Sequence, residues 1–119
     1  MKFLPVLALL LAAPASAQVA PPPPPLSLEH RMLLRCSAAF ALVARWQQAG
    51  IAEFVQYPPL DERGREFFVR ASAKVMDEAR LDREAIQAAL VVEAQSLLPP
   101  GAVAAIMPAC LSALEASEQ

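Results

Sequence analysis

Residues 27–50 of the chain read SLEHRMLLRCSAAFALVARWQQAG, and this stretch decides the fold class. Ser27 is a preferred helix N-cap residue, and Gly50 is a natural residue just beyond a helix C-terminus. No proline or glycine lies between them. Apolar residues recur there at spacings of three and four: Leu33, Cys36, Phe40 and Val43. The pattern predicts one amphipathic helix with a broad buried face over residues 27–49.

The next predicted helix has Asp61 as its cap and runs to about Arg80. Its inner stripe is expected to hold four apolar residues at helical spacing: Phe68, Ala71, Val75 and Ala79. The segment before it, residues 51–57, is compatible with one helical turn or with a short extended piece. The Pro58-Pro59 pair that follows should end either structure.

Two more helices are predicted in the last third of the chain. The third follows Asp82 and is apolar almost all round, which is typical of a central helix covered on several faces. The fourth has the most regular stripe: Val103, Ile106, Met107, Cys110, Leu111 and Leu114. Pro108 lies inside that stripe, so the fourth helix is expected either to kink or to split there.

Together these segments predict an all-α fold, a small bundle of about four helices over residues 27–117. The two cysteines, Cys36 and Cys110, lie on the inner stripes of the first and last helices. In an oxidising compartment one inter-helix disulfide is the simplest pairing, with two free thiols or an intermolecular bridge as the alternatives. The bridge would close a loop of about 75 residues and contribute about 4 kcal/mol in the chain-entropy model.

Residues 1–17 have the organisation of a cleavable signal peptide. Lys2 supplies a positive charge, an uncharged apolar run follows, and residues 15–17 (Ala-Ser-Ala) are the small residues that signal peptidase requires. The run is shorter than the roughly 20 apolar residues of a membrane-spanning helix, and prolines interrupt it. We therefore expect a periplasmic or secreted protein with no stable membrane anchor after cleavage.

Residues 18–26 form a proline-rich lead between the predicted signal and the helical domain. Five consecutive prolines at positions 21–25 favour a short polyproline II segment. We expect a spacer that keeps the cleavage site clear of the folded domain. Docking of the prolines into an aromatic groove of a partner is the alternative.

The sequence lacks most residue patterns that support catalysis or cofactor binding. It has one histidine, His30, and three glycines, and it contains neither Cys-x-x-Cys nor Gly-x-Ser-x-Gly. These features argue against a nucleophilic triad, a metal site, covalent haem and a phosphate-binding loop. The net charge of −2 argues against nucleic acid as a partner. We expect no cofactor and no metal, and a binding protein is favoured over an enzyme.

Two groups of residues are candidates for function. Glu93 falls on the apolar side of the predicted third helix, where a carboxylate needs an arginine partner or serves as an acid or base. Arg63, Phe67 and Arg70 form a candidate partner surface. Adjacent Phe67 and Phe68 cannot both point inward, and Phe68 matches the inner stripe. An ordinary solvated face is the alternative, because acidic residues are interleaved with the arginines.

Three segments resemble small exported proteobacterial proteins that have no assigned function: residues 34–44 (LRCSAAFALVA), 63–70 (RGREFFVR) and 107–111 (MPACL). The resemblance implies no activity and no site residues. A looser likeness, in size, compartment and cysteine number, is to the small periplasmic acid-stress chaperones. The leading expectation is a periplasmic binding or accessory protein that contacts other periplasmic proteins. A chaperone for unfolding clients, a small-ligand carrier and a carboxylate-based enzyme are the alternatives.

Overall fold

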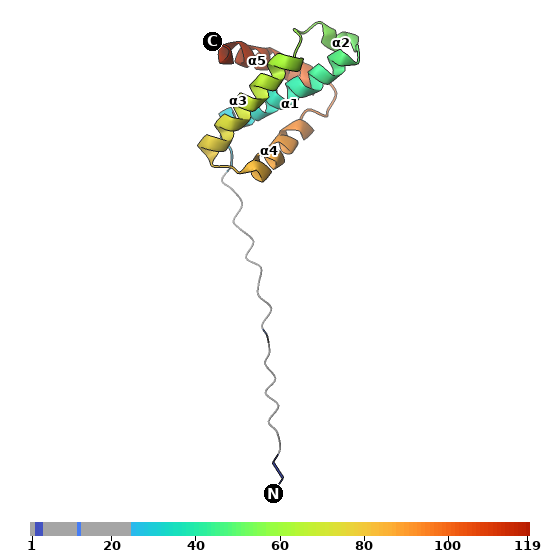
Figure 1. The fold of residues 1–119 in the computed structure, drawn as a ribbon. Coiled ribbons are helices and arrows are strands. Elements are labelled where there is room, and N and C mark those ends of the chain that lie inside the picture. The colour runs from blue at the N-terminus through green and yellow to red at the C-terminus, as the bar shows by residue number, and fades with distance from the viewer. Residues whose placement is uncertain (1, 4–11, 13–24) are drawn as a thin grey trace.

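The computed structural model describes residues 2–3, 12 and 25–119, and this part of the chain is helical and contains no strand (Figure 1). Its helices are α1 (Leu28–Gln48), α2 (Ala52–Val55), α3 (Asp61–Ala79), α4 (Arg83–Gln95) and α5 (Ala102–Ser117). The predicted all-α fold is therefore confirmed, with the one-turn helix α2 added between the first two long helices. The predicted signal peptide and the proline-rich lead up to residue 24 lie almost entirely outside the described residues. None of the described helices is both long enough and apolar enough to span a membrane.

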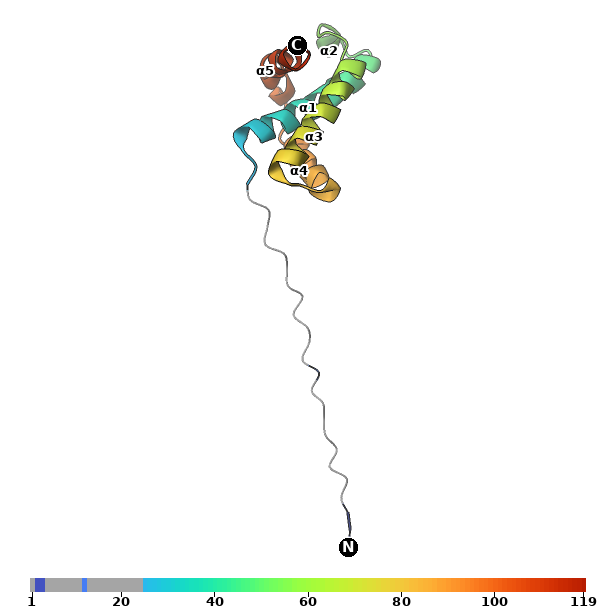
Figure 2. The same cartoon turned by 60° about the vertical axis from the view of Figure 1, so that its left-hand side comes forward.

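Helix α1 is the centre of the bundle, because it contacts each of the other four helices. α3 runs beside it, whereas α4 and α5 pack on α1 without packing on one another (Figure 2). The prediction that the third long helix, α4, would be central was wrong. α4 buries Ile86 and Glu93 toward the bundle, whereas Val91 and Val92 are 55% and 61% exposed. An apolar helix at the edge of a bundle has the same sequence pattern as a central one, so length and composition alone did not distinguish them.

The predicted ends of the helices are largely confirmed by their caps. The Ser27 hydroxyl accepts the His30 amide at 3.0 Å, and the Asp82 carboxylate accepts the Ala85 amide at 2.8 Å. Asp61 was predicted as the cap of α3 but is its first helical residue, with Leu60 in the cap position. α5 continues through Pro108 without splitting.

A single side chain, Gln47, fixes the connection from α1 through α2 to α3. Its amide nitrogen donates to the carbonyl oxygens of Phe54, Tyr57 and Pro58 at 3.0–3.2 Å. Its oxygen accepts the amide of Leu60 at 3.1 Å. One carboxamide thus pairs with four backbone groups of this connection and holds the start of α3 against the end of α1.

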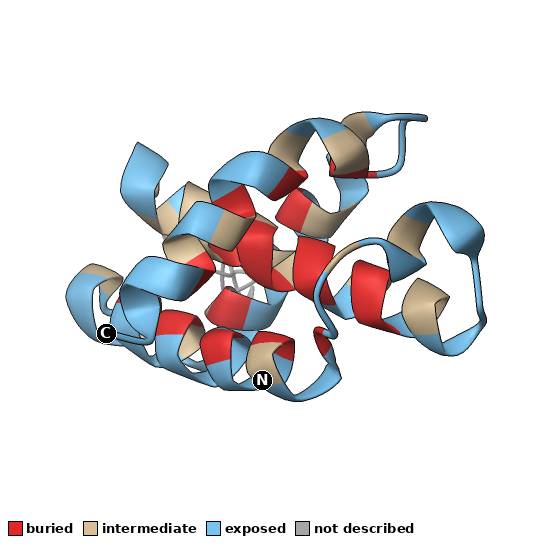
Figure 3. Ribbon diagram, turned by 90° about the horizontal axis from the view of Figure 1, so that it is seen from above, coloured by how far each residue is buried: buried red, intermediate tan, exposed pale blue. Residues whose placement is uncertain are grey.

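Buried residues, red in Figure 3, line the inside of the bundle. They form two separate clusters. The larger lies where α1, α3 and α5 meet, and the rings of Phe40 and Phe67 pack there edge to face at a centroid distance of 5.1 Å. The Cys36 and Cys110 sulfurs lie at disulfide distance in this cluster, with Cα atoms 5.2 Å apart, inside the usual range. The smaller cluster joins α4 to α1 and α3 through Leu34, Val75 and Ile86.

The inner stripe of α3 differs from the predicted one by one residue. Phe67 is buried at 2% exposure and Phe68 is 38% exposed, so the expectation that Phe68 would point inward was wrong. Gly64 brings α3 close to α1, since an added Cβ there would be 3.0 Å from Phe40 Cβ. Phe67 follows one turn later and packs its ring edge to face on Phe40 in the core.

Candidate functional site

The predicted partner surface of Arg63, Phe67 and Arg70 does not exist as a free surface. Phe67 is in the core, and both arginines bind the C-terminal end of α5. Arg63 donates to both carboxylate oxygens of Glu118 at 2.9 and 2.6 Å, and Arg70 donates to the Ser117 hydroxyl at 3.0 Å. The hydrogen bond from Arg63 lowers the pKa of Glu118 and raises the pKa of Arg63. These arginines therefore hold the end of α5, where a helix favours positive charge.

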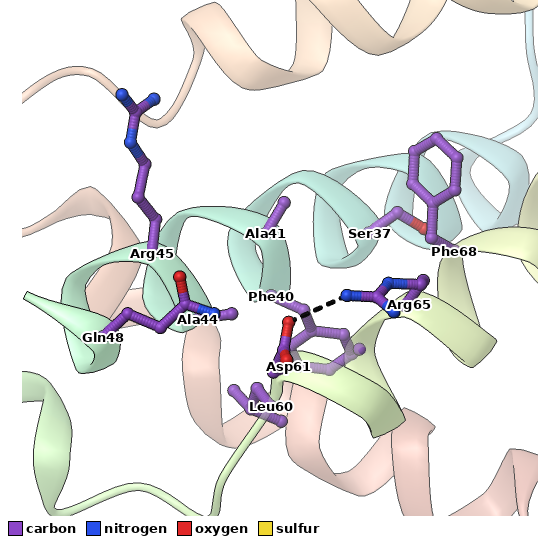
Figure 4. A pocket seen from close by; sticks show the side chains of 11 residues that line it. Ser37, Phe40, Ala41, Ala44, Arg45, Gln48, Leu60, Asp61, Arg65 and Phe68 are labelled. Carbon is purple, nitrogen blue, oxygen red and sulfur yellow. Dashed lines mark hydrogen bonds and ion pairs between the residues drawn. The ribbon is translucent and has the colours of Figure 1, made fainter.

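The ring of Phe68 and the neighbouring Arg65 line a groove between α1 and the start of α3 (Figure 4). We call it the α1–α3 groove, and it has a cavity volume of about 270 Å³. Residues of α1 form one wall, and Phe68 and Arg65 of α3 form the other. The aromatic ring and the arginine on this surface are therefore Phe68 and Arg65, and not the predicted Phe67 with Arg63 and Arg70.

The floor of the α1–α3 groove is apolar and fixed. Phe40, Ala44 and Leu60 are buried beneath it, and Gly64 leaves the floor without a side chain at the closest approach of the two helices. Leu60 is held in place by its backbone hydrogen bond to Gln47. The groove therefore has a preformed shape set by packed residues, which is typical of a binding site.

The rim of the groove carries more positive than negative charge. Arg65 donates to Asp61 one turn before it on α3, at 3.0 Å, so this arginine is largely compensated (Figure 4). Arg45 extends from α1 at the opposite wall and makes no ion pair within the described part of the chain. The groove thus combines an apolar floor with an arginine at its edge, whose side chain extends away from the floor residues (Figure 4) and has no ion-pair partner in the described residues.

The second sequence candidate, Glu93, is buried at 3% exposure and paired. Arg31 Nε donates to one carboxylate oxygen at 3.2 Å, and Arg35 Nε donates to the other at 2.8 Å. Both arginines come from α1, so the triad fastens α4 to the central helix. Because each oxygen already accepts an arginine hydrogen bond, the geometry favours the ion-pair interpretation of Glu93 over an acid or base role.

The remaining reactive side chains do not assemble into a catalytic or metal centre in the described residues. His30 Nε2 lies 3.2 Å from Glu78, and no group of three or more metal-ligating side chains occurs among the residues described. Ser37 lines the groove, yet its hydroxyl is buried and donates to the Leu33 carbonyl at 2.8 Å. The site offers apolar contact and charge pairing rather than a nucleophile.

Sequence reasoning missed the α1–α3 groove because it chose the wrong phenylalanine for the core. The residue stripes through Phe67 and Phe68 both have helical spacing, so periodicity did not separate them. Gly64 marks close packing against a neighbouring helix, but it lies three residues before Phe67 and four before Phe68 and therefore fits both stripes. The sequence held no local signal that separated the two.

Comparison with known proteins adds no further indication of function. No protein-family model matches the chain, and neither a curated protein nor a solved structure matches it. The functional inference therefore starts from the geometry of the groove.

Proposed function

We propose that this chain is a non-enzymatic binding or accessory protein of the periplasm, and that its α1–α3 groove binds a segment of another protein. The segment would insert an apolar side chain next to a carboxylate. One observation carries the proposal: a preformed apolar floor lies beside Arg45, a guanidinium group without an ion-pair partner in the described residues.

The size of the groove supports a peptide side chain rather than a large cofactor. Its volume of about 270 Å³ lies just below the range of small-molecule pockets. Phe40 and Leu60 provide the floor, and the half-exposed ring of Phe68 covers one side. A leucine or phenylalanine side chain would gain contact with all three residues and displace water from them.

The charge at the rim supports an acidic rather than a basic segment. Arg45 presents a planar donor group that matches a carboxylate in two parallel hydrogen bonds. Arg65 has further donors besides the one that contacts Asp61. An acidic residue next to the inserted apolar side chain would therefore be bound, and a basic residue would be repelled.

Nuclear magnetic resonance titration with short synthetic peptides tests the proposal. Peptides with leucine or phenylalanine next to glutamate should shift the amide signals of Arg45 and Gly64, and peptides with lysine in place of glutamate should not. Phe68→Ala and Arg45→Glu should each weaken binding about tenfold, which is about 1.4 kcal/mol. The matched controls Val69→Ala and Arg83→Glu change exposed residues outside the groove and should leave binding unchanged. Absence of binding by all such peptides, or binding unaffected by both groove variants, would overturn the proposal.

A second candidate, an acid-stress chaperone, is favoured by the way α4 is attached. The carboxylate of Glu93 is the negative partner of both Arg31 and Arg35, so loss of its charge would remove the ionic tie between α4 and α1. Release of α4 would expose Leu34 of α1 and Ile86 of α4, which are buried in the cluster between these helices. The wild-type protein should prevent client aggregation in acid, and Glu93→Gln should already prevent it at neutral pH, because the variant lacks the ionic tie. A chain that stays folded in acid and protects no client would exclude this function.

A further inference from the structure

A second cavity lies where α4 and α5 approach α1, and we call it the α4–α5 cavity. Its volume is about 320 Å³, which is within the range of small-molecule sites. Its lining comes from α1, from the residues just after α4 and from the start of α5, and consists of Arg35, Ser96, Leu97, Ala102, Ala105 and Ile106. None of these residues lines the α1–α3 groove, so the inference goes beyond the proposed function and does not depend on it.

Positive charge exceeds negative charge at the edge of this cavity. Arg31 and Arg35 share one carboxylate, that of Glu93, so the three groups together carry a net charge of +1. Each of the two arginines donates to Glu93 through Nε and makes no other side-chain hydrogen bond within the described part of the chain. A guanidinium group carries several further N–H donors, so Arg35 keeps donors for an anion at the cavity.

No other carboxylate of the described residues competes for these donors. Residues 94–114, which include the connection from α4 to α5 and most of α5, contain no charged residue. Glu29, in the first turn of α1, lies 3.4 Å from Lys74 of α3 and makes no contact with Arg35. The wall that faces Arg35 is therefore uncharged, and the carboxylate of a ligand would balance the surplus positive charge.

The rest of the lining favours a hydrocarbon chain. Leu97 is buried, and Ile106 and two alanines of α5 continue the apolar wall. The hydroxyl of Ser96 is already engaged, because it donates to the carbonyl oxygen of Glu93. A peptide would bring backbone amide and carbonyl groups for which the lining offers no free side-chain partner besides Arg35. An aliphatic carboxylate has its polar atoms at one end only, and therefore matches both the arginine and the apolar wall.

We infer that the α4–α5 cavity binds a small aliphatic carboxylate. The carboxylate group lies on Arg35, and the hydrocarbon chain lies against Leu97 and Ile106. Glu93 acts as a positioning residue for this site, because its hydrogen bond from Nε already restricts the Arg35 side chain. Less conformational entropy is then lost when the ligand binds.

Isothermal titration calorimetry with octanoate tests the inference on the full chain after signal removal. Octanoate should bind. Octanamide has the same chain without the charge, and acetate has the charge without the chain, so each should bind at least about tenfold more weakly. In nuclear magnetic resonance spectra octanoate should shift the amide signals of Leu97 and Ile106. It should not shift those of Arg45 and Gly64, which line the α1–α3 groove.

Variants at exposed positions of α5 separate binding from folding. Ala105→Glu puts a negative charge into the cavity and should weaken octanoate binding at least about tenfold. The matched control Ala116→Glu lies about three turns further along α5, outside the cavity, and should bind like wild type. Both variants should keep the wild-type circular dichroism spectrum. Arg35→Gln should also weaken binding, with Arg31 left to pair with Glu93.

Four results would overturn the inference. They are absence of octanoate binding at millimolar concentration, equal binding of octanamide, equal binding of acetate, and octanoate binding that Ala105→Glu leaves unchanged.

Discussion

Helices α5 and α4 both pack on α1, but different interactions hold them there. α5 contributes Val103, Met107 and Leu114 to the large apolar cluster, and Cys110 lies at disulfide distance from Cys36 of α1. α4 contributes one buried apolar residue of its own, Ile86, and one buried carboxylate. The attachment of α5 is apolar and covalent, and that of α4 is in large part ionic.

This contrast indicates that the two attachments respond to different conditions. Apolar burial and a disulfide are insensitive to salt and to moderate changes in pH. A buried ion pair contributes little net free energy to folding. Removal of one partner is nevertheless destabilising, because the remaining charge is left buried without an opposite charge. α4 is therefore expected to be the first of the two helices to detach when the charge of Glu93 is removed, and α5 the first to detach under reducing conditions.

The largest expected effect follows loss of the cysteine bridge. The double variant Cys36→Ser and Cys110→Ser should lower the free energy of unfolding by about 4 kcal/mol in the chain-entropy model. Urea unfolding followed by circular dichroism measures this change. Hydrogen exchange should show greater loss of protection in α5 than in α4. A loss below about 1 kcal/mol would mean that the apolar cluster alone holds α5.

A smaller effect is expected from neutralisation of Glu93. Glu93→Gln keeps the shape of the side chain but leaves Arg31 and Arg35 without an anion, and should cost about 1–3 kcal/mol. The arginines are partly exposed and regain water, which keeps the cost below that of a fully buried pair. Hydrogen exchange should rise in α4 and not in α5. Glu78→Gln, at a more exposed pair, is the control and should cost less than about 1 kcal/mol.

A modest gain in stability is expected at the end of α3. Arg80 has a positive φ of 55°, a backbone conformation that glycine adopts without steric cost. Arg80→Gly should therefore raise the free energy of unfolding by about 0.5–1 kcal/mol. Arg83→Gly, inside the first turn of α4, should lower it by a similar amount. An equal loss of unfolding free energy in both variants would show that the conformation of Arg80 is not strained.

The smallest expected effect is a pH dependence at the end of α5. Arg63 lowers the pKa of Glu118 in the folded protein. Such a pair stabilises the folded state above the unfolded pKa of the carboxyl group, and the contribution disappears as pH falls through the folded pKa. A carbon-detected titration should give Glu118 a lower midpoint than the exposed Glu62, and Arg63→Gln should remove the difference. Equal midpoints in the wild-type protein would contradict the pairing.

Local signals in the sequence predicted the helices well. Ser27 and Asp82 act as caps where they were expected, because capping depends on a few adjacent residues. The pairing of Cys36 with Cys110 at disulfide distance also agrees with the prediction, since both stripes point inward. These features need no knowledge of how the helices are arranged.

The spacing of apolar residues along the sequence did not predict how the helices pack on one another. Phe67 and Phe68 both fit a helical stripe, and only the packing of Phe67 on Phe40 in the folded bundle distinguishes them. The arginine partners of Glu93 were not predictable either, because only the position of α4 against α1 brings Arg31 and Arg35 to it. The α1–α3 groove was missed for the same reason, because its walls come from two helices.

The Cys36–Cys110 pair has a consequence for how the chain withstands proteolysis. When bridged, it closes a covalent ring that contains both the α1–α3 groove and helix α4. A single cut in the connections at residues 56–60 or 96–101 would then yield two fragments that remain one molecule. The predicted signal peptide lies outside the ring, so its removal would release it completely. The same chain would thus lose its leader in one cleavage, while a single cut within the domain would leave the α1–α3 groove and α4 attached to one another.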